Sequence, residues 1–257
     1  LIYICHRLIL NPLLSKNTLF MSVEFIVFFA ILSFLTSLLT SVFSVGGGLI
    51  MLIALAQSFS PATLIPLHGS IQLANNFSRT LVYREFVRWG LIKHILISTI
   101  FGALVGIFLF GTLSENLLLI LIACTILFLT WAPIDNFILS VMKNDWFCGL
   151  ISGFAGIFVG ANGPLVTAYL RTKNLPPEVL VANHGAIMIF QHSVRIILFT
   201  SFLSFSIQDY ILFIFILALT GYAGANIGKR LISSIPFDSF NIALKVLLTF
   251  LSIFLII

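Results

Sequence analysis

Eight apolar blocks, most of them about twenty residues long, set the strongest limit on what this chain can fold into. They lie at about 24–56, 61–83, 91–111, 116–133, 146–170, 178–200, 208–228 and 239–257. A helix needs about 20 apolar residues to cross the hydrocarbon core of a bilayer. The blocks are too long for soluble strands and lack the two-residue alternation of a membrane barrel. The sequence therefore predicts an all-α integral membrane protein with about eight hydrophobic segments.

Charged residues are scarce and lie between these blocks. Only 8% of the 257 residues are charged, whereas a soluble domain carries about 25%. The mean hydropathy is +1.18. The net charge of +5 is concentrated in the connecting loops, where basic residues orient membrane helices. We therefore expect the lipid bilayer as a partner, and no nucleic acid.

Two stretches of the chain, 47–79 and 163–195, align without a gap when one is shifted by 116 residues. Shared Leu or Ile means little in so apolar a chain, but His and Arg are rare in it. The shift aligns the His68-Gly69 pair with the His184-Gly185 pair, and Arg79 with Arg195. This pattern predicts an internal duplication.

The duplication divides the chain into two pseudo-symmetric membrane repeats of four segments each. The predicted parts are an N-terminal extension of uncertain status (1–20), a first repeat (21–134), a polar connection (135–145) and a second repeat (146–257). A GAxxG pattern recurs in the third segment of each repeat, at 102–106 and 224–228. Small residues at this spacing let helix backbones approach closely, so we expect these glycines to pack helices together.

The first segment of each repeat is interrupted, at Gly46-Gly47-Gly48 and at Asn162-Gly163-Pro164. Each glycine costs a helix interior about 1 kcal/mol relative to Ala, and Pro suits the first turn of a new helix. A helix that restarts inside the membrane presents unpaired N–H groups and a positive dipole end, which bind anions. Matched breaks in two repeats are a pointer to a transporter binding site. We therefore predict broken or re-entrant helices with a site between them.

A polar stripe follows each break. His68, Gln72, Asn75, Asn76 and Arg79 fall on one face of a helix. The second stripe contains His184, Gln191, His192 and Arg195. Such faces avoid lipid and line the bundle interior or a wet cavity. Arg79 could instead extend to the lipid headgroups, whereas an interior position is favoured for Arg195.

The distribution of charge favours an anionic ligand. Every Asp and Glu lies in a loop or near the end of a block, so a cation site or a carboxylate proton relay has no mid-membrane carboxylate to use. The HExxH, GxSxG and GxxxxGK patterns of common enzymes are absent. We therefore expect no enzyme, no catalytic residues, no cofactor and no bound metal.

The sequence leaves the relative orientation of the two repeats open. Four crossings per repeat would make the two repeats parallel. Basic residues, however, follow the second block (Arg84, Arg88, Lys93) but precede the sixth (Arg171, Lys173). The positive-inside rule then favours inverted repeats, which a re-entrant hairpin at each break would permit.

With these motifs the chain resembles the TauE/SafE sulfite-exporter family over about 21–257. The resemblance rests on the glycine signatures at 44–48 and 156–164, each followed by a Pro-containing loop and a His-bearing helix. It implies a multi-pass protein of a prokaryotic inner membrane that exports small sulfur-containing anions.

We therefore predict a secondary transporter, an exporter, of a small anion such as sulfite or an organosulfonate. The predicted binding residues are Gly46, Gly47, Gly48, His68, Asn75, Asn162, Gly163, His184, Gln191 and Arg195. One alternative is an intramembrane enzyme that uses His184 and His192, although Asn76 aligns with His192 and argues against it. A second alternative is a membrane scaffold or sensor, which would not need the polar stripes.

Overall fold

The computed structural model describes residues 21–43, 46–131, 143–160, 162–231, 245–246, 248–250 and 252–253. The side chains of Val42, Phe43, Arg79, Val82, Pro177 and residues 229–231 are outside this description. The predicted extension 1–20, most of the connection 135–145 and part of the last segment also lie outside the described residues.

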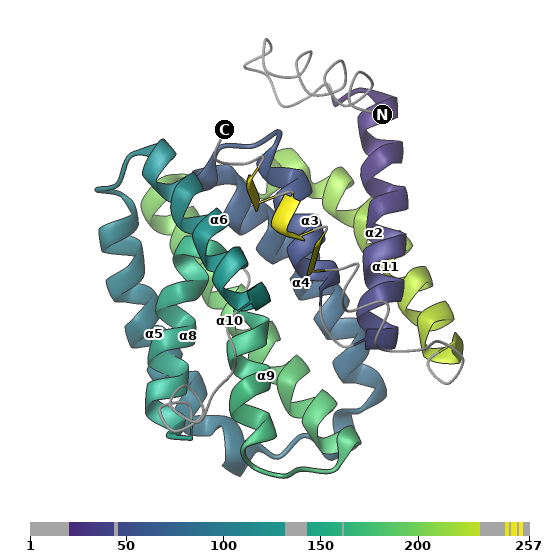
Figure 1. Ribbon diagram of the computed structural model, residues 1–257, viewed down its shortest axis with the longest axis vertical. Coiled ribbons are helices and arrows are strands. Elements are labelled where there is room, and N and C mark those ends of the chain that lie inside the picture. The colour runs from purple at the N-terminus through teal and green to yellow at the C-terminus, as the bar shows by residue number, and fades with distance from the viewer. Residues whose placement is uncertain are drawn as a thin grey trace.

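The described residues are helical and contain no strand, which confirms the predicted all-α fold. Figure 1 shows the helices gathered in one bundle. In the predicted first repeat, called the first repeat below, they are α2 (Val23–Phe43), α3 (Gly47–Ala56), α4 (Pro61–Val82), η2 (Arg84–Phe86), α5 (Trp89–Phe110) and α6 (Glu115–Trp131). In the second they are α8 (Asp145–Val159), α9 (Gly163–Arg171), α10 (Pro177–Leu203), η3 (Gln208–Tyr210) and α11 (Ile211–Leu231).

Both predicted interruptions are helix breaks. A new helix starts at Gly47 in the first repeat and at Gly163 in the second. The resulting helices α3 and α9 have only 10 and 9 residues. At 1.5 Å per residue each is about 15 Å long, roughly half of a bilayer core. Each break therefore places a helix N-terminus inside the bundle.

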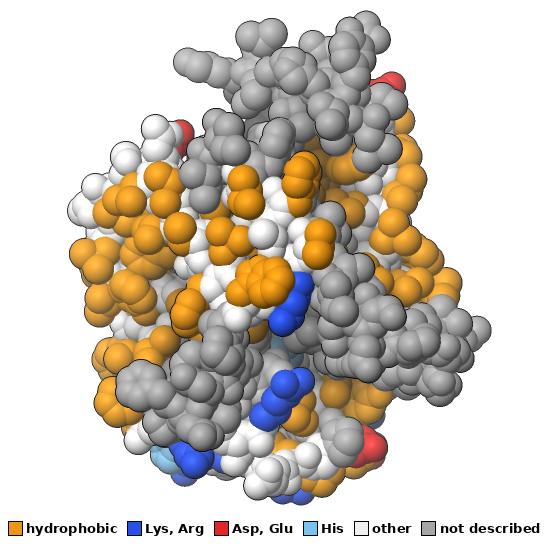
Figure 2. Space-filling view, viewed as in Figure 1, with side chains coloured by type: hydrophobic (Ala, Val, Ile, Leu, Met, Phe, Trp, Pro, Cys, Tyr) orange, Lys and Arg blue, Asp and Glu red, His pale blue; other side chains and the backbone are white. Residues whose placement is uncertain are grey.

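Four of the described helices are long and apolar enough to cross a membrane, by length and composition: Val23–Ser41, Trp89–Phe110, Glu178–Leu203 and Gln208–Gly228. Large hydrophobic side chains cover much of the outside of the bundle (Figure 2). Examples are Phe101, Phe108 and Leu212, which are 57%, 63% and 63% exposed. Such a surface is suited to lipid rather than water.

The long helices pair across the two repeats, α5 with α8 and α2 with α11. Glycines make these contacts possible, as expected for the two GAxxG patterns. A Cβ on Gly102 would overlap the carbonyl of Leu150 on α8, and one on Gly224 would overlap the carbonyl of Phe34 on α2. Only glycine lets these backbones come so close.

Helices α4 and α10, which carry the two polar stripes, pack against each other in opposite directions. Gly69 of α4 lies next to Arg195 of α10, while Gly185 of α10 lies next to Thr80 of α4. Because α4 and α10 correspond under the 116-residue shift, this antiparallel crossing is the arrangement that inverted repeats would give.

The antiparallel crossing also brings the two groups of basic residues to one end of the bundle. The loop after α4 contacts the first turns of α10, where the backbone N–H of Arg88 donates to Asn183 Oδ1 at 2.9 Å. Asn183 Nδ2 also donates to the carbonyl of Phe86 at 3.2 Å. Arg171 and Lys173 immediately precede α10. Both basic groups therefore lie at the same end.

Candidate functional site

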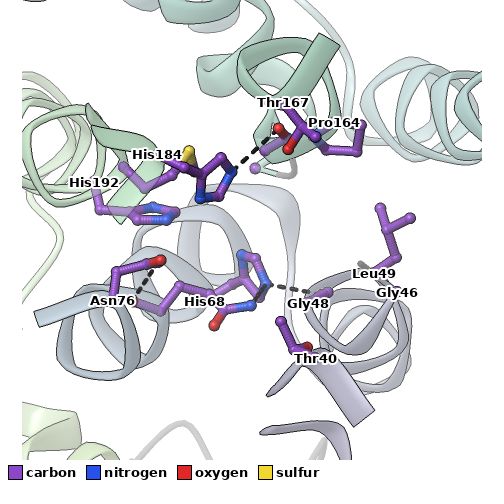
Figure 3. A pocket seen from close by; sticks show the side chains of 14 residues that line it. Thr40, Gly46, Gly48, Leu49, His68, Asn76, Pro164, Thr167, His184 and His192 are labelled. Atoms are coloured by element: carbon purple, nitrogen blue, oxygen red, sulfur yellow. Dashed lines mark hydrogen bonds between the residues drawn. The ribbon is translucent and has the colours of Figure 1, made fainter. Parts of the chain in front are cut away.

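A cavity lies between the two helix breaks and the two stripe-bearing helices (Figure 3). Its volume is about 80 Å³, several times the ~10–15 Å³ that one water needs, so a small polyatomic ion fits. The first repeat lines it with Thr40, Gly46, Gly48, Leu49, His68, Gln72 and Asn76. The second repeat lines it with Gly160, Gly163, Pro164, Thr167, His184, Met188 and His192.

The N-terminus of α3 supplies backbone donors to this cavity. Gly46 caps the helix with a φ of 99°, a left-handed conformation that favours glycine. The first hydrogen bond of the helix joins the Ile50 N–H to the Gly46 carbonyl at 3.0 Å. The N–H groups of Gly47, Gly48 and Leu49 therefore precede the helical ladder. Together with the helix dipole they favour an anion at this end.

His68 and His184, which align in the repeat, make equivalent contacts. Nε2 of His68 lies 3.0 Å from the carbonyl of Gly48, and Nε2 of His184 lies 3.4 Å from that of Gly163. Each stripe-bearing helix thus holds the start of its own half-helix through a histidine. In Figure 3 the two rings face each other across the cavity, beside His192.

A buried hydrogen-bond network lies behind the cavity wall in the second repeat. Nη1 of Arg195 donates to the carbonyl of Gly160 at 3.0 Å, and Nη2 donates to Asn162 Oδ1 at 3.0 Å. Nδ2 of Asn162 donates to the side chain of Gln191. Nε2 of Gln191 in turn donates to Ser152 Oγ at 2.7 Å and to Thr99 Oγ1 at 3.0 Å. The network ties the second break to α10, α8 and α5.

Arg195 is a buried cation, as the sequence favoured, with 2% of its surface exposed. The ion pairs found in the described part of the chain involve only Asp145, and none reaches Arg195. Among the described residues its Nε has no hydrogen-bond partner. Burying a charge without a counter-ion is costly, so a negative charge nearby would be strongly favoured.

The predicted binding residues occupy three places. Those lining the cavity are Gly46, Gly48, His68, Gly163 and His184. Those in the network behind it are Asn162, Gln191 and Arg195. Gly47 and Asn75 line a second, adjoining cavity instead. The structure therefore brings all ten into one region but places only half of them on the main cavity.

Several lining residues are missing from the predicted set: Thr40, Leu49, Gln72, Asn76, Gly160, Pro164, Thr167, Met188 and His192. Gln72, Asn76 and His192 belong to the polar stripes, so the sequence signal was present for them. His192 and His184 line the same cavity, as the enzyme alternative requires. Within the described residues no group of three or more His, Cys, Asp or Glu side chains could hold a metal.

A polar cluster holds the outer end of the half-helix α9. Asp145, at the start of α8, accepts hydrogen bonds from Lys173 Nζ at 2.9 Å and from the Tyr169 hydroxyl at 3.0 Å. His94 Nδ1 of α5 lies 3.7 Å from the same carboxylate. The cluster thus anchors α9 to the α5–α8 pair at the basic end of the bundle.

A family model described as sulfite exporter TauE/SafE matches residues 29–255 of the chain. The matched range includes both helix breaks, both stripe-bearing helices and every residue that lines the cavity. Comparisons with curated proteins and with solved structures give no match.

Proposed function

The chain belongs to the TauE/SafE sulfite exporter family, and on that premise we propose that it is a secondary membrane transporter of a small anion. The cargo is a sulfur oxoanion such as sulfite, or a small organosulfonate. It binds in the cavity between the two helix breaks, where the N-terminus of α3 and the side chains of both stripes supply donors.

The observation that carries this proposal is the buried charge of Arg195. Within the described part of the chain its guanidinium hydrogen-bonds to neutral acceptors, among them the carbonyl of Gly160, which lines the cavity. A bound anion would compensate this charge in a medium where electrostatic interactions are strong. Since the described lining contains no Asp, Glu, Lys or Arg and the cavity is small, affinity would depend on the anionic group rather than on a large organic tail.

The architecture supports alternating access. The cavity lies where the two repeats meet. The half-helices α3 and α9 extend from it toward opposite ends of the bundle. Rocking of one repeat against the other would open the cavity first to one side and then to the other. The basic end of the bundle would face the cytoplasm under the positive-inside rule. The family description names an exporter, so in a prokaryotic inner membrane the anion would move out of the cytoplasm.

Reconstituted proteoliposomes test this function directly. Vesicles containing the protein should accumulate labelled sulfite faster than protein-free vesicles, and His184→Ala or Arg195→Ala should abolish the difference. His94→Ala provides a matched control, because His94 lies in the Asp145 cluster and outside the cavity. Sulfite flux that is unchanged in both His184→Ala and Arg195→Ala would refute the proposed site. Flux equal to that of empty vesicles for sulfite, sulfate and sulfoacetate alike would refute the proposed function.

A further inference from the structure

A second, smaller cavity adjoins the first and is bounded by α2, α3 and α4. Its volume is about 20 Å³, and Thr40, Gly48 and Gln72 line both cavities. The remaining lining residues are Thr36, Ser37, Gly47, Met51 and Asn75. The space is too small for a polyatomic anion, so any ligand there differs from the one in the main cavity.

The threonines of this second cavity have already used their hydrogens. The hydroxyl of Thr36 donates to the carbonyl of Ser33 at 3.2 Å, and that of Thr40 donates to the carbonyl of Thr36 at 2.8 Å. A hydroxyl carries one hydrogen and two lone pairs. What these two side chains can still offer a ligand is therefore lone pairs alone.

Asn75 adds an acceptor that no described residue satisfies. Its Oδ1 is buried and has no hydrogen-bond partner, while its Nδ2 donates to Gln72 at 3.4 Å. The hydroxyl oxygens of Ser37 and Ser33 lie close by, 2.9 and 3.1 Å from the position that a Cβ would take on Gly221. Asn75 Oδ1 is nearer still to that position. Several neutral oxygens therefore converge beside Gly221.

The corresponding place in the other repeat contains a positive charge. Thr40 aligns with Gly156 under the 116-residue shift. A Cβ on Gly156 would lie 2.8 Å from Arg195 Nη2, so the guanidinium occupies this space in the second repeat. It is held there by neutral oxygens of Gly160 and Asn162. Nη1 also donates to Nδ1 of His192 at 3.1 Å, so the cation is held by neutral acceptors of this chain.

We propose that the second cavity binds a monovalent cation, Na⁺, through the neutral oxygens of Thr36, Ser37, Thr40 and Asn75. Hard cations prefer oxygen ligands, and Na⁺ sites beside helix breaks use such groups. The last turns of α2, which carry the threonines, contribute the negative end of a helix dipole. A divalent cation is disfavoured, because no carboxylate is present to offset its greater desolvation cost.

This site would couple cation binding to the main cavity. Gln72 lies between them, since its side chain contacts Asn75 on one side and lies 3.4 Å from His68 Nε2 on the other. Bound Na⁺ would raise the affinity of the main cavity for an anion. By thermodynamic linkage, the bound anion would raise the affinity of the second cavity for Na⁺ by the same factor. Binding of Na⁺ itself does not depend on the proposed transport function.

Thermal unfolding of the purified protein in detergent tests the proposal, with no sulfur anion present. Tm should rise with NaCl and saturate, but should not rise with KCl or choline chloride at equal ionic strength. Thr40→Val and Ser37→Ala should each remove or weaken this Na⁺-specific rise. Thr130→Val is the matched control, because its hydroxyl makes the same bond to the carbonyl four residues earlier, at 2.6 Å, far from both cavities.

Three outcomes would overturn the proposal. Equal Tm values in the three salts would show that no Na⁺ site exists. A Na⁺-specific rise that survives both cavity variants would place the ion elsewhere. An equally large rise with KCl would show that the cavity does not select Na⁺. Anion binding, measured separately in choline salts, decides the proposed function without bearing on this test.

Discussion

Arg195 Nη1 lies 3.1 Å from Nδ1 of His192, one helical turn earlier on α10. A guanidinium can only donate, so Nδ1 accepts this hydrogen bond and the ring hydrogen of neutral His192 is on Nε2. His192 lines the main cavity, and Arg195 therefore fixes it as a donor. The arginine thus has two effects there, a positive charge and a defined imidazole tautomer.

These two effects predict a graded response to substitution of Arg195. Arg195→Gln should lower the affinity for sulfite at least about tenfold, since close pairs of opposite charges couple by about 1.5–7 kcal/mol. Arg195→Lys should lose less, because it keeps the charge while losing the forked contacts to Gly160 and Asn162. Isothermal titration with sulfite measures both, and gel filtration checks that the variants fold. Equal affinities for the two variants would contradict a role for the charge.

Removing either cavity histidine should destabilise the protein as well as impair binding. His68→Ala leaves the Gly48 carbonyl without its imidazole donor, and His184→Ala does the same at Gly163. Each carbonyl lies in the first turn of its half-helix, so the loss is that of one hydrogen bond, which contributes about 0.5–1.5 kcal/mol. Chemical denaturation of the purified variants measures this loss, with His94→Ala as the control. No loss in either variant would show that the two contacts do not support the half-helices.

The glycines between paired helices should be intolerant of even one methyl group. Gly102→Ala and Gly224→Ala place a Cβ against a backbone carbonyl. Overpacking of this kind typically lowers the unfolding free energy by about 1–3 kcal/mol. Gly111→Ala is a stringent control, because nothing lies within 4 Å of its Cβ position. Tm in detergent should fall for the first two variants only. A fall of similar size for Gly111→Ala would point to backbone flexibility instead of packing.

The Asp145–Lys173 pair should matter little to global stability. The two side chains are 26% and 27% exposed, and pairs open to water contribute about 0–1 kcal/mol. Asp145→Asn should therefore lower the unfolding free energy by less than about 1 kcal/mol, and salt should shrink the difference. Denaturation at low and high ionic strength measures this effect. A large, salt-insensitive loss would mean that anchoring of α9 is essential to the fold.

The sequence is sufficient to locate the helix breaks and the stripe-bearing helices. Gly46–Gly48 and Asn162–Pro164 interrupt apolar runs with residues that destabilise helices, and this local signal does not depend on the rest of the fold. The burial of Arg195 also follows from sequence, because a charge surrounded by apolar residues has few other places to lie. These features are determined by nearby residues alone.

The sequence is not sufficient to assign each residue to a cavity. Gln191 and His192 are neighbours separated by about 100° around the helix, and both fit the polar stripe. In the structure His192 lines the cavity, whereas Gln191 turns to Thr99 and Ser152 on α5 and α8. That choice depends on helices that pack there from distant parts of the chain. The sequence also does not indicate the second cavity. Its oxygens come from two helices, α2 and α4, and carry no charge that would mark them as a site.

The pairing of α2 with α11 has a consequence for biosynthesis. Ser33 donates to the carbonyl of Leu217 at 2.7 Å, across a sequence separation of 184 residues. At about 5–20 residues per second, a ribosome needs on the order of ten to forty seconds to produce that partner. During this interval α2 is in the membrane with its serine- and threonine-bearing face uncovered. Insertion chaperones and quality-control proteases that recognise polar faces of unassembled helices would therefore be able to bind α2 until α11 has been made.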